Sequence, residues 1–103
     1  MPRVKPVTHG DGSPYGVHWD CPGCAAPHVV PTSGPNAWGF NGDMERPTLS
    51  PSVLCHPHPA LDEHGKRYET PRCHTFIRDG RIEFLADCTH ALAGQTVDLP
   101  EVP

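Results

Sequence analysis

The stretch that decides the fold runs from Arg72 to Leu99 and reads RCHTFIRDGRIEFLADCTHALAGQTVDL. Its centre is the dipeptide Asp79-Gly80, which lies between two runs of β-forming residues. Asp-Gly tolerates positive φ at both positions, as a two-residue type I′ hairpin loop requires. The stretch therefore predicts a β-hairpin. The expected pairs are Arg78 with Arg81, Ile77 with Ile82, Thr75 with Phe84 and Cys73 with Ala86.

The two faces of this hairpin differ in character, because strand side chains alternate between the faces of a sheet. One face carries Cys73, Thr75, Ile77, Ile82, Phe84 and Ala86. The other carries His74, Phe76, Arg78, Arg81, Glu83 and Leu85. We expect the strand to end near Asp87. If the alternation continues past that point, Cys88 and His90 lie on the Cys73 face.

The composition predicts a small all-β chain with little or no helix. The 103 residues include 14 prolines, and only 36% of the residues are hydrophobic. Proline can neither continue a helix nor donate to a β ladder, so short strands and many turns are expected. A core this thin benefits from a metal staple. We expect a single domain over residues 1–103.

Charge and cysteine content exclude some classes of protein. The net charge is −4 with eight Lys and Arg residues, which argues against a large phosphate-binding surface. Five cysteines form an odd set that suits thiolate ligation better than disulfides. No apolar run is long enough for a membrane span, and no signal-peptide pattern opens the chain. We therefore expect a soluble cytoplasmic protein that does not bind membranes.

The rest of the chain predicts short strands joined by turns. Residues 1–16 are expected to form an extended N-terminal arm, and residues 56–71 a flexible polar loop rich in proline and histidine. The expected strands are residues 16–20, 27–31, 37–41, 52–55 and 95–100.

Cys21-Pro-Gly-Cys24 has the spacing of a zinc knuckle. The glycine permits the tight turn that lets both sulfurs face one ion, and thiolates prefer zinc or iron. We expect Cys73 as the third ligand of a Zn²⁺ ion, and His90 or Cys88 as the fourth. His28 and His74 are rivals for the fourth position. The alternatives to a metal site are a redox dithiol and an ordinary pair of small core residues.

A catalytic cluster is also conceivable on the same segment. His74, Asp87 and His90, together with Thr48 or Ser50, supply the side chains that acid–base chemistry needs. A catalytic zinc would keep one position open for water, whereas a structural zinc has four protein ligands. The simpler interpretation is that a histidine near a zinc ligand only orients that ligand or faces solvent.

Three segments resemble a family of small proteins from tailed phages and prophages, a domain of unknown function that is often mislabelled ammonia monooxygenase. These segments are residues 46–52, 73–82 and 87–97, which together with the knuckle cover most of the chain from Trp19 to Pro100. The resemblance implies a phage or prophage gene expressed in a bacterial cytoplasm, and it implies no established activity. It also favours His90 over Cys88 as a ligand, because relatives can carry Ser at the position of Cys88.

The sequence therefore predicts a zinc-ribbon-like mini-domain that acts as a non-enzymatic accessory module and binds a host or phage protein. Its metal ligands would be Cys21, Cys24, Cys73 and His90, with no catalytic residue. One alternative is a small zinc-dependent hydrolase that uses His74, Asp87 and His90. A second is a nucleic-acid-binding zinc ribbon, with a face lined by Arg72, Arg78, Arg81, Trp38 and Tyr68.

Overall fold

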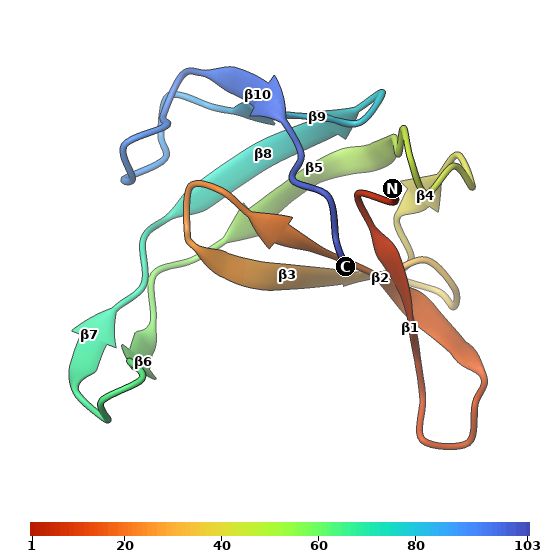
Figure 1. Ribbon diagram of the computed structural model, residues 1–103, viewed down its shortest axis with the longest axis horizontal. Helices are drawn as coiled ribbons and strands as arrows, with labels where there is room; N and C mark the ends of the chain where they lie inside the picture. The colour runs from red at the N-terminus through yellow and green to blue at the C-terminus, as the bar shows by residue number, and fades with distance from the viewer.

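The computed structural model describes residues 1–103 as ten β-strands with no helix, which confirms the predicted fold class (Figure 1). It therefore contains no helix that could span a membrane. The strands are β1 (Lys5–Thr8), β2 (Pro14–Cys21), β3 (Ala26–Pro31), β4 (Gly39–Phe40), β5 (Leu49–Cys55), β6 (Pro59–Leu61), β7 (Arg67–Glu69), β8 (Cys73–Arg78), β9 (Arg81–Phe84) and β10 (Thr96–Asp98).

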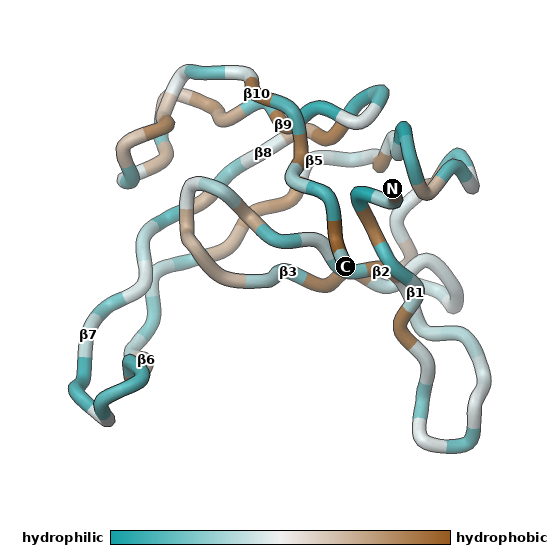
Figure 2. The backbone as a smooth tube through the Cα atoms, in the orientation of Figure 1, coloured by the Kyte–Doolittle hydropathy of each residue, from teal (hydrophilic) through white to brown (hydrophobic).

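All strand pairs are antiparallel and form three sheets. The first sheet has the order β1-β2-β3, the second β10-β9-β8-β5-β4, and the third is the β6-β7 hairpin. The first two sheets share one hydrophobic core, while hydrophilic residues gather toward the ends of the projecting hairpins (Figure 2). The buried cluster comprises Val4, Val17, Trp19, Cys21, Val30, Leu49, Val53, Cys73, Ile77, Ile82, Phe84, Cys88 and Leu99.

The β8–β9 hairpin has the predicted loop and most of the predicted register. Asp79 and Gly80 both have positive φ, 51° and 76°, as the type I′ interpretation requires. The pairs from Arg78–Arg81 to Thr75–Phe84 are present. The expected Cys73–Ala86 pair is not part of the ladder, because β9 ends at Phe84 and the chain then turns. This early turn changes where the following residues lie.

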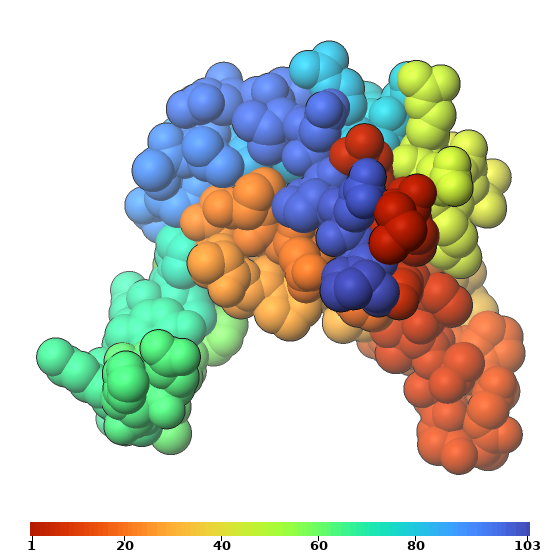
Figure 3. Space-filling view, viewed as in Figure 1, coloured from red at the N-terminus to blue at the C-terminus, as the bar shows by residue number.

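Residues 1–16 and 56–71 contain more regular structure than their composition suggests. The first segment contributes β1 and the start of β2, and Val4 is fully buried. The second contains the two strands β6 and β7, joined by a turn in which Asp62 accepts hydrogen bonds from the backbone of His64 and Lys66. Both hairpins project from the body of the molecule (Figure 3).

Candidate active site and metal centre

Three polar side chains from separate parts of the chain form a line on the outer face of the five-stranded sheet. The Oγ atom of Ser52 lies 3.1 Å from Nε2 of His74. The other ring nitrogen of His74, Nδ1, lies 3.2 Å from Oδ2 and 3.3 Å from Oδ1 of Asp87. A hydroxyl, an imidazole and a carboxylate joined in this order, through the two nitrogens of one ring, have the arrangement of a catalytic triad.

Strand register places the first two members together. Leu54 of β5 lies directly opposite His74 of β8. Ser52 precedes Leu54 by two residues and therefore lies on the same face of the sheet as His74. The pairing of β5 with β8 is irregular between Leu49 and Val53, so Ser52 sits in a bulged part of the strand. Bulges often re-aim a side chain next to an active site.

The turn after β9 supplies the third member. The backbone N–H of Cys88 donates to the carbonyl of Leu85 at 3.1 Å, which folds the chain back across the start of β8. The Sγ atom of Cys88 lies 3.2 Å from the backbone nitrogen of His74 and 3.3 Å from its carbonyl oxygen. The residue next to Asp87 thus contacts both backbone polar groups of His74. This contact keeps Asp87 close to the start of β8.

The geometry suits activation of the Ser52 hydroxyl. With the Nδ1–H of His74 donating to Asp87, Nε2 keeps its lone pair and accepts the hydroxyl proton. The side chain of His74 is 26% exposed and that of Asp87 is 47% exposed, so solvent reaches the carboxylate. The indole Nε1–H of Trp38 donates to the carbonyl of Ser52 at 3.4 Å and holds that backbone in place.

The largest hollow of the molecule is unrelated to this triad. It has a volume of about 440 Å³ and lies at the Asp79-Gly80 loop. Its charged side chains pair with one another, since Arg46 lies 3.5 Å from Asp79 and Arg81 lies 3.5 Å from Asp98. Chemistry depends on the convergence of reactive groups and not on cavity size, so the triad is the stronger candidate for an active site.

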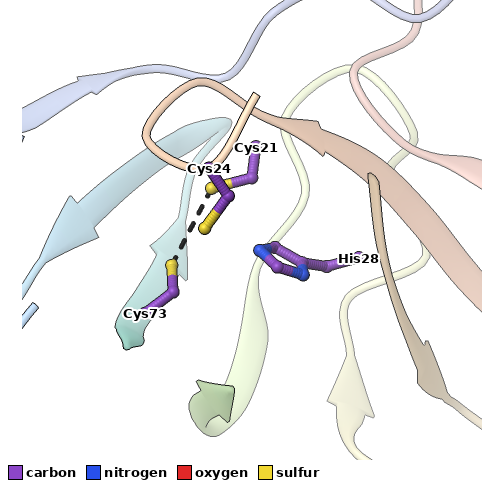
Figure 4. A group of neighbouring side chains, drawn as sticks. All are labelled: Cys21, Cys24, His28 and Cys73. Carbon is purple, nitrogen blue, oxygen red and sulfur yellow. Dashed lines mark hydrogen bonds between the residues drawn. The ribbon is translucent and has the colours of Figure 1, made fainter. Parts of the chain in front are cut away.

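A second cluster lies between the two large sheets. Cys21, Cys24, His28 and Cys73 each place one ligand atom within 4.8 Å of every other (Figure 4). Cys21 ends β2, Cys24 lies in the turn that follows, His28 belongs to β3 and Cys73 begins β8. The cluster therefore joins the three-stranded sheet to the five-stranded sheet.

The distances within this cluster suit a tetrahedral ion. Sγ of Cys21 lies 3.8 Å from Sγ of Cys73. Two sulfurs that each lie about 2.3 Å from a tetrahedral zinc would be roughly 3.8 Å apart. The Nε2 atom of His28 is buried and has no hydrogen-bond partner, while Nδ1 of the same ring lies 3.5 Å from Sγ of Cys55. An orphaned ring nitrogen facing three sulfurs is the arrangement that a metal ion would satisfy.

The protonation of this cluster follows from its hydrogen bonds. A hydrogen bond from the Cys73 thiol lowers the pKa of Cys21 to about 4, and the same bond raises the pKa of Cys73. Burial lowers the pKa of His28, but the neighbouring sulfurs of Cys21 and Cys55 outweigh burial and raise it to about 11. Burial and the charge on Cys21 raise the pKa of Cys24. A metal ion that binds all four residues must therefore displace protons from Cys24, Cys73 and His28.

The remaining predicted ligand, His90, belongs to a different group. Its ring lies near Cys73 and Cys88, whereas the group around the knuckle contains His28. The ring of His90 packs edge-on against Phe84, with 4.6 Å between centroids, and it covers Gly23 of the knuckle. A Cβ atom at Gly23 would lie 2.3 Å from Cε1 of His90. The close approach of this ring explains why glycine stands at position 23.

The sequence predicted no catalytic residue, and it placed His74 and Asp87 only in the alternative of a zinc-dependent hydrolase, together with His90. That alternative named Thr48 or Ser50 as the hydroxyl group and did not consider Ser52. Thr48 instead accepts a hydrogen bond from the backbone of Asp79 at 2.9 Å, and Ser50 pairs with Gly39 of β4. The signal for Ser52 is its register with His74. That register depends on the bulge in β5 and has no motif in the sequence.

Comparison with known proteins gives one family. The family described as "BubE: Bacterial ubiquitination-like system serine protease" matches residues 3–85. No curated protein and no solved structure matches the chain. The family description overturns our prediction of a non-enzymatic protein-binding module, because it names a protease. Since the match covers most of the 103 residues, the chain belongs to the BubE family of serine proteases of bacterial ubiquitination-like systems.

Proposed function

We propose that this chain is a serine protease whose nucleophile is Ser52, whose general base is His74 and whose orienting carboxylate is Asp87. The observation that carries the proposal is the pair of contacts of the His74 ring, 3.1 Å to the hydroxyl and 3.2 Å to the carboxylate. The family description supports the same class of reaction and suggests that the substrate is a protein of a ubiquitination-like system.

The reaction follows from the positions of these groups. Oγ of Ser52 attacks the carbonyl carbon of the substrate, while its proton passes to Nε2 of His74. His74 then gives this proton to the leaving amine as the amide C–N bond breaks, which leaves an acyl ester on Ser52. A water molecule, deprotonated by His74, attacks the ester and releases the second product. Asp87 keeps the ring in the required tautomer and stabilises the imidazolium that forms in each step.

The test is covalent labelling of Ser52 with a small alkyl fluorophosphonate, followed by mass spectrometry of the modified peptide. We expect labelling of wild-type protein at Ser52, and none at this position in Ser52→Ala. Ser50→Ala is the matched control, because Ser50 is exposed, lies two residues away and does not contact His74. Wild-type protein that reacts at Ser50 or not at all would refute the assignment.

We also propose that Zn²⁺ occupies the cluster of Cys21, Cys24, His28 and Cys73. Four protein ligands leave no open position for water, so this zinc would be structural. Its role would be to stabilise the contact between the two large sheets, and hydrolysis would proceed through Ser52 rather than through a metal-bound water. His28 replaces His90 in the ligand set that we expected, because the unpartnered Nε2 of His28 faces the sulfurs.

Metal analysis of purified protein tests the zinc proposal. We expect about one zinc per chain, and X-ray absorption at the zinc edge should give three sulfur ligands and one nitrogen ligand. A coordination shell that contains a water oxygen would argue for a catalytic zinc instead. The cytoplasmic location and the phage or prophage origin inferred from the sequence stay predictions.

A further inference from the structure

We propose that the substrate binds as an added strand along the open edge of β5, where Leu54 supplies one main-chain donor and one main-chain acceptor. This inference rests on the proposed protease function, because the edge matters through its position beside Ser52. It adds a main-chain binding site for an extended segment of the substrate protein. Strand addition to an exposed sheet edge is a recurring mode of peptide recognition.

The direction of the Leu54 backbone follows from the partners of His74. The N–H of His74 points to Sγ of Cys88 at 3.2 Å, and its carbonyl accepts the N–H of Leu85 at 2.9 Å. Both backbone groups of His74 therefore point away from β5. Residues directly opposite in an antiparallel ladder either exchange both hydrogen bonds or exchange none. The Leu54–His74 pair exchanges none, so the N–H and C=O of Leu54 point away from β8.

The same alternation holds along the preceding part of β5. The carbonyl of Thr48 accepts the N–H of Asn41 at 3.2 Å, and Ser50 pairs with Gly39. The backbone N–H and C=O groups of the even-numbered residues in this segment therefore point toward β4. The carbonyl of Ser52 faces the same way and accepts the indole N–H of Trp38. β4 pairs with β5 only at Leu49 and Ser50 and does not reach Leu54.

No other strand covers this part of the edge. The neighbours of β5 in its sheet are β8 on one side and the two-residue β4 on the other. The Leu54 side chain is 42% exposed and lies on the face that carries His74. The edge thus offers an unpaired donor, an unpaired acceptor and an apolar contact two residues from the nucleophile. An extended peptide pairs with such an edge through its own N–H and C=O groups.

Shallow hollows at both ends of the edge would receive side chains of the bound strand. One has a volume of about 230 Å³ and is lined by Asn36, Ala37, Trp38 and Pro51. The other has a volume of about 240 Å³, and its lining includes Cys55 and Tyr68 as well as Cys24 and His28 of the metal cluster. Neither hollow is lined by an Asp, Glu, Lys or Arg side chain. Recognition at this edge therefore depends more on main-chain hydrogen bonds than on the identity of one substrate side chain.

The experiment compares three covalent probes of Ser52. They are tripeptidyl diphenyl phosphonates with mixed side chains, the same compounds with methylated amide nitrogens, and a small alkyl fluorophosphonate that lacks amides. We measure the second-order rate of Ser52 modification by mass spectrometry. Two main-chain hydrogen bonds should make the unmethylated peptides react about tenfold faster than the methylated ones in wild-type protein.

Leu54→Pro removes the donor, and proline is tolerated at an edge strand where its nitrogen faces solvent. In this variant the peptide rate, divided by the fluorophosphonate rate, should fall about threefold to tenfold. Leu54→Ala is the matched control, because it keeps the N–H and removes the side chain. If circular dichroism shows that Leu54→Pro is unfolded, the methylated and unmethylated peptides on wild-type protein decide the question.

The outcomes separate the binding edge from the triad. Equal rates for methylated and unmethylated peptides, or an unchanged rate ratio in folded Leu54→Pro, would overturn strand addition while the triad stands. Labelling of Ser52 by the fluorophosphonate but by neither peptide would do the same. Failure of the fluorophosphonate to label wild-type Ser52 would overturn the protease itself, and the binding edge with it.

Discussion

Removal of the metal should both strongly destabilise the fold of this chain and lower its reactivity at Ser52. The proposed ion links Cys21, Cys24 and His28 of one sheet to Cys73 of the other. Cys73 is followed directly by His74, which is the proposed general base. Loss of the ion therefore releases β8, which holds the proposed base. The stability of the fold and the reactivity of Ser52 should decrease together.

The size of the effect can be worked out from the loop that the ion closes. Cys21 and Cys73 are 52 residues apart in the chain. By the loop-closure relation used for disulfides, a cross-link across such a loop stabilises the folded state by roughly 4 kcal/mol. Zinc binding in small domains supplies about 10 kcal/mol or more. A domain of this size has a total stability of only about 5–15 kcal/mol, so the metal-free chain should be marginal.

The assay is thermal unfolding followed by circular dichroism, with metal content measured on the same samples. Chelation should lower Tm by at least about 15 °C, since each kcal/mol shifts Tm by about 4–8 °C in a domain of this size. His28→Ala should resemble the chelated protein. His90→Ala, the matched control, should keep its zinc. Metal-free protein whose Tm stays within about 3 °C of the loaded form would refute this reasoning.

Three further perturbations test the triad and the hairpin that supports it. Asp87→Asn should lower kcat/KM by about 10²- to 10⁴-fold without changing Tm, because the ring of His74 loses its preferred tautomer; an unchanged rate would remove Asp87 from the triad. Cys88→Ala leaves the partly buried N–H of His74 without its partner and should destabilise the fold by about 1 kcal/mol in urea titrations, whereas Cys88→Ser should recover most of that loss. Equal stability of the two variants would show that the contact with His74 is unimportant. Gly80→Ala should destabilise the hairpin by about 1–2 kcal/mol, because φ of this residue is 76° and a Cβ atom would lie 3.2 Å from the carbonyl oxygen of Glu45. A variant with the Tm of the wild-type protein would contradict this expectation.

Local patterns in the sequence were sufficient to predict the elements that depend on neighbouring residues. The Asp79-Gly80 loop fixes the register of its own hairpin, since a two-residue turn leaves no freedom in the pairing. The faces of β8 follow from that register, so the buried position of Cys73 and the outward position of His74 could be predicted. The turn between Cys21 and Cys24 is likewise a local property of the knuckle.

The proposed fourth ligand of the metal site, His28, shows where reasoning from local patterns stops. We extended the strand alternation from Cys73 to His90, but β9 ends at Phe84 and the chain turns back at Leu85. The alternation of side chains between the two faces of a sheet does not continue beyond the end of a strand. The hairpin of β2 and β3 held the better signal: Cys21 pairs with Ala26, and His28 follows Ala26 by two residues on the same face. Strand alternation within that hairpin therefore places His28 on the same face as the first cysteine.

Ser52 could not be found in this way, because its position depends on contacts between distant segments. Two more residues lie between Leu49 and Val53 on β5 than between their partners on β8, and no local pattern reveals that bulge. The order Ser, His, Asp along the chain also differs from the orders of the well-known serine hydrolase folds, so no familiar motif marks Ser52 as the proposed nucleophile. The triad exists only when β5, β8 and the turn after β9 are packed together. In a chain with so small a core, the proposed triad would therefore depend on the same cross-sheet contacts that the metal ion would hold, and Ser52 would not be activated in a partly unfolded molecule.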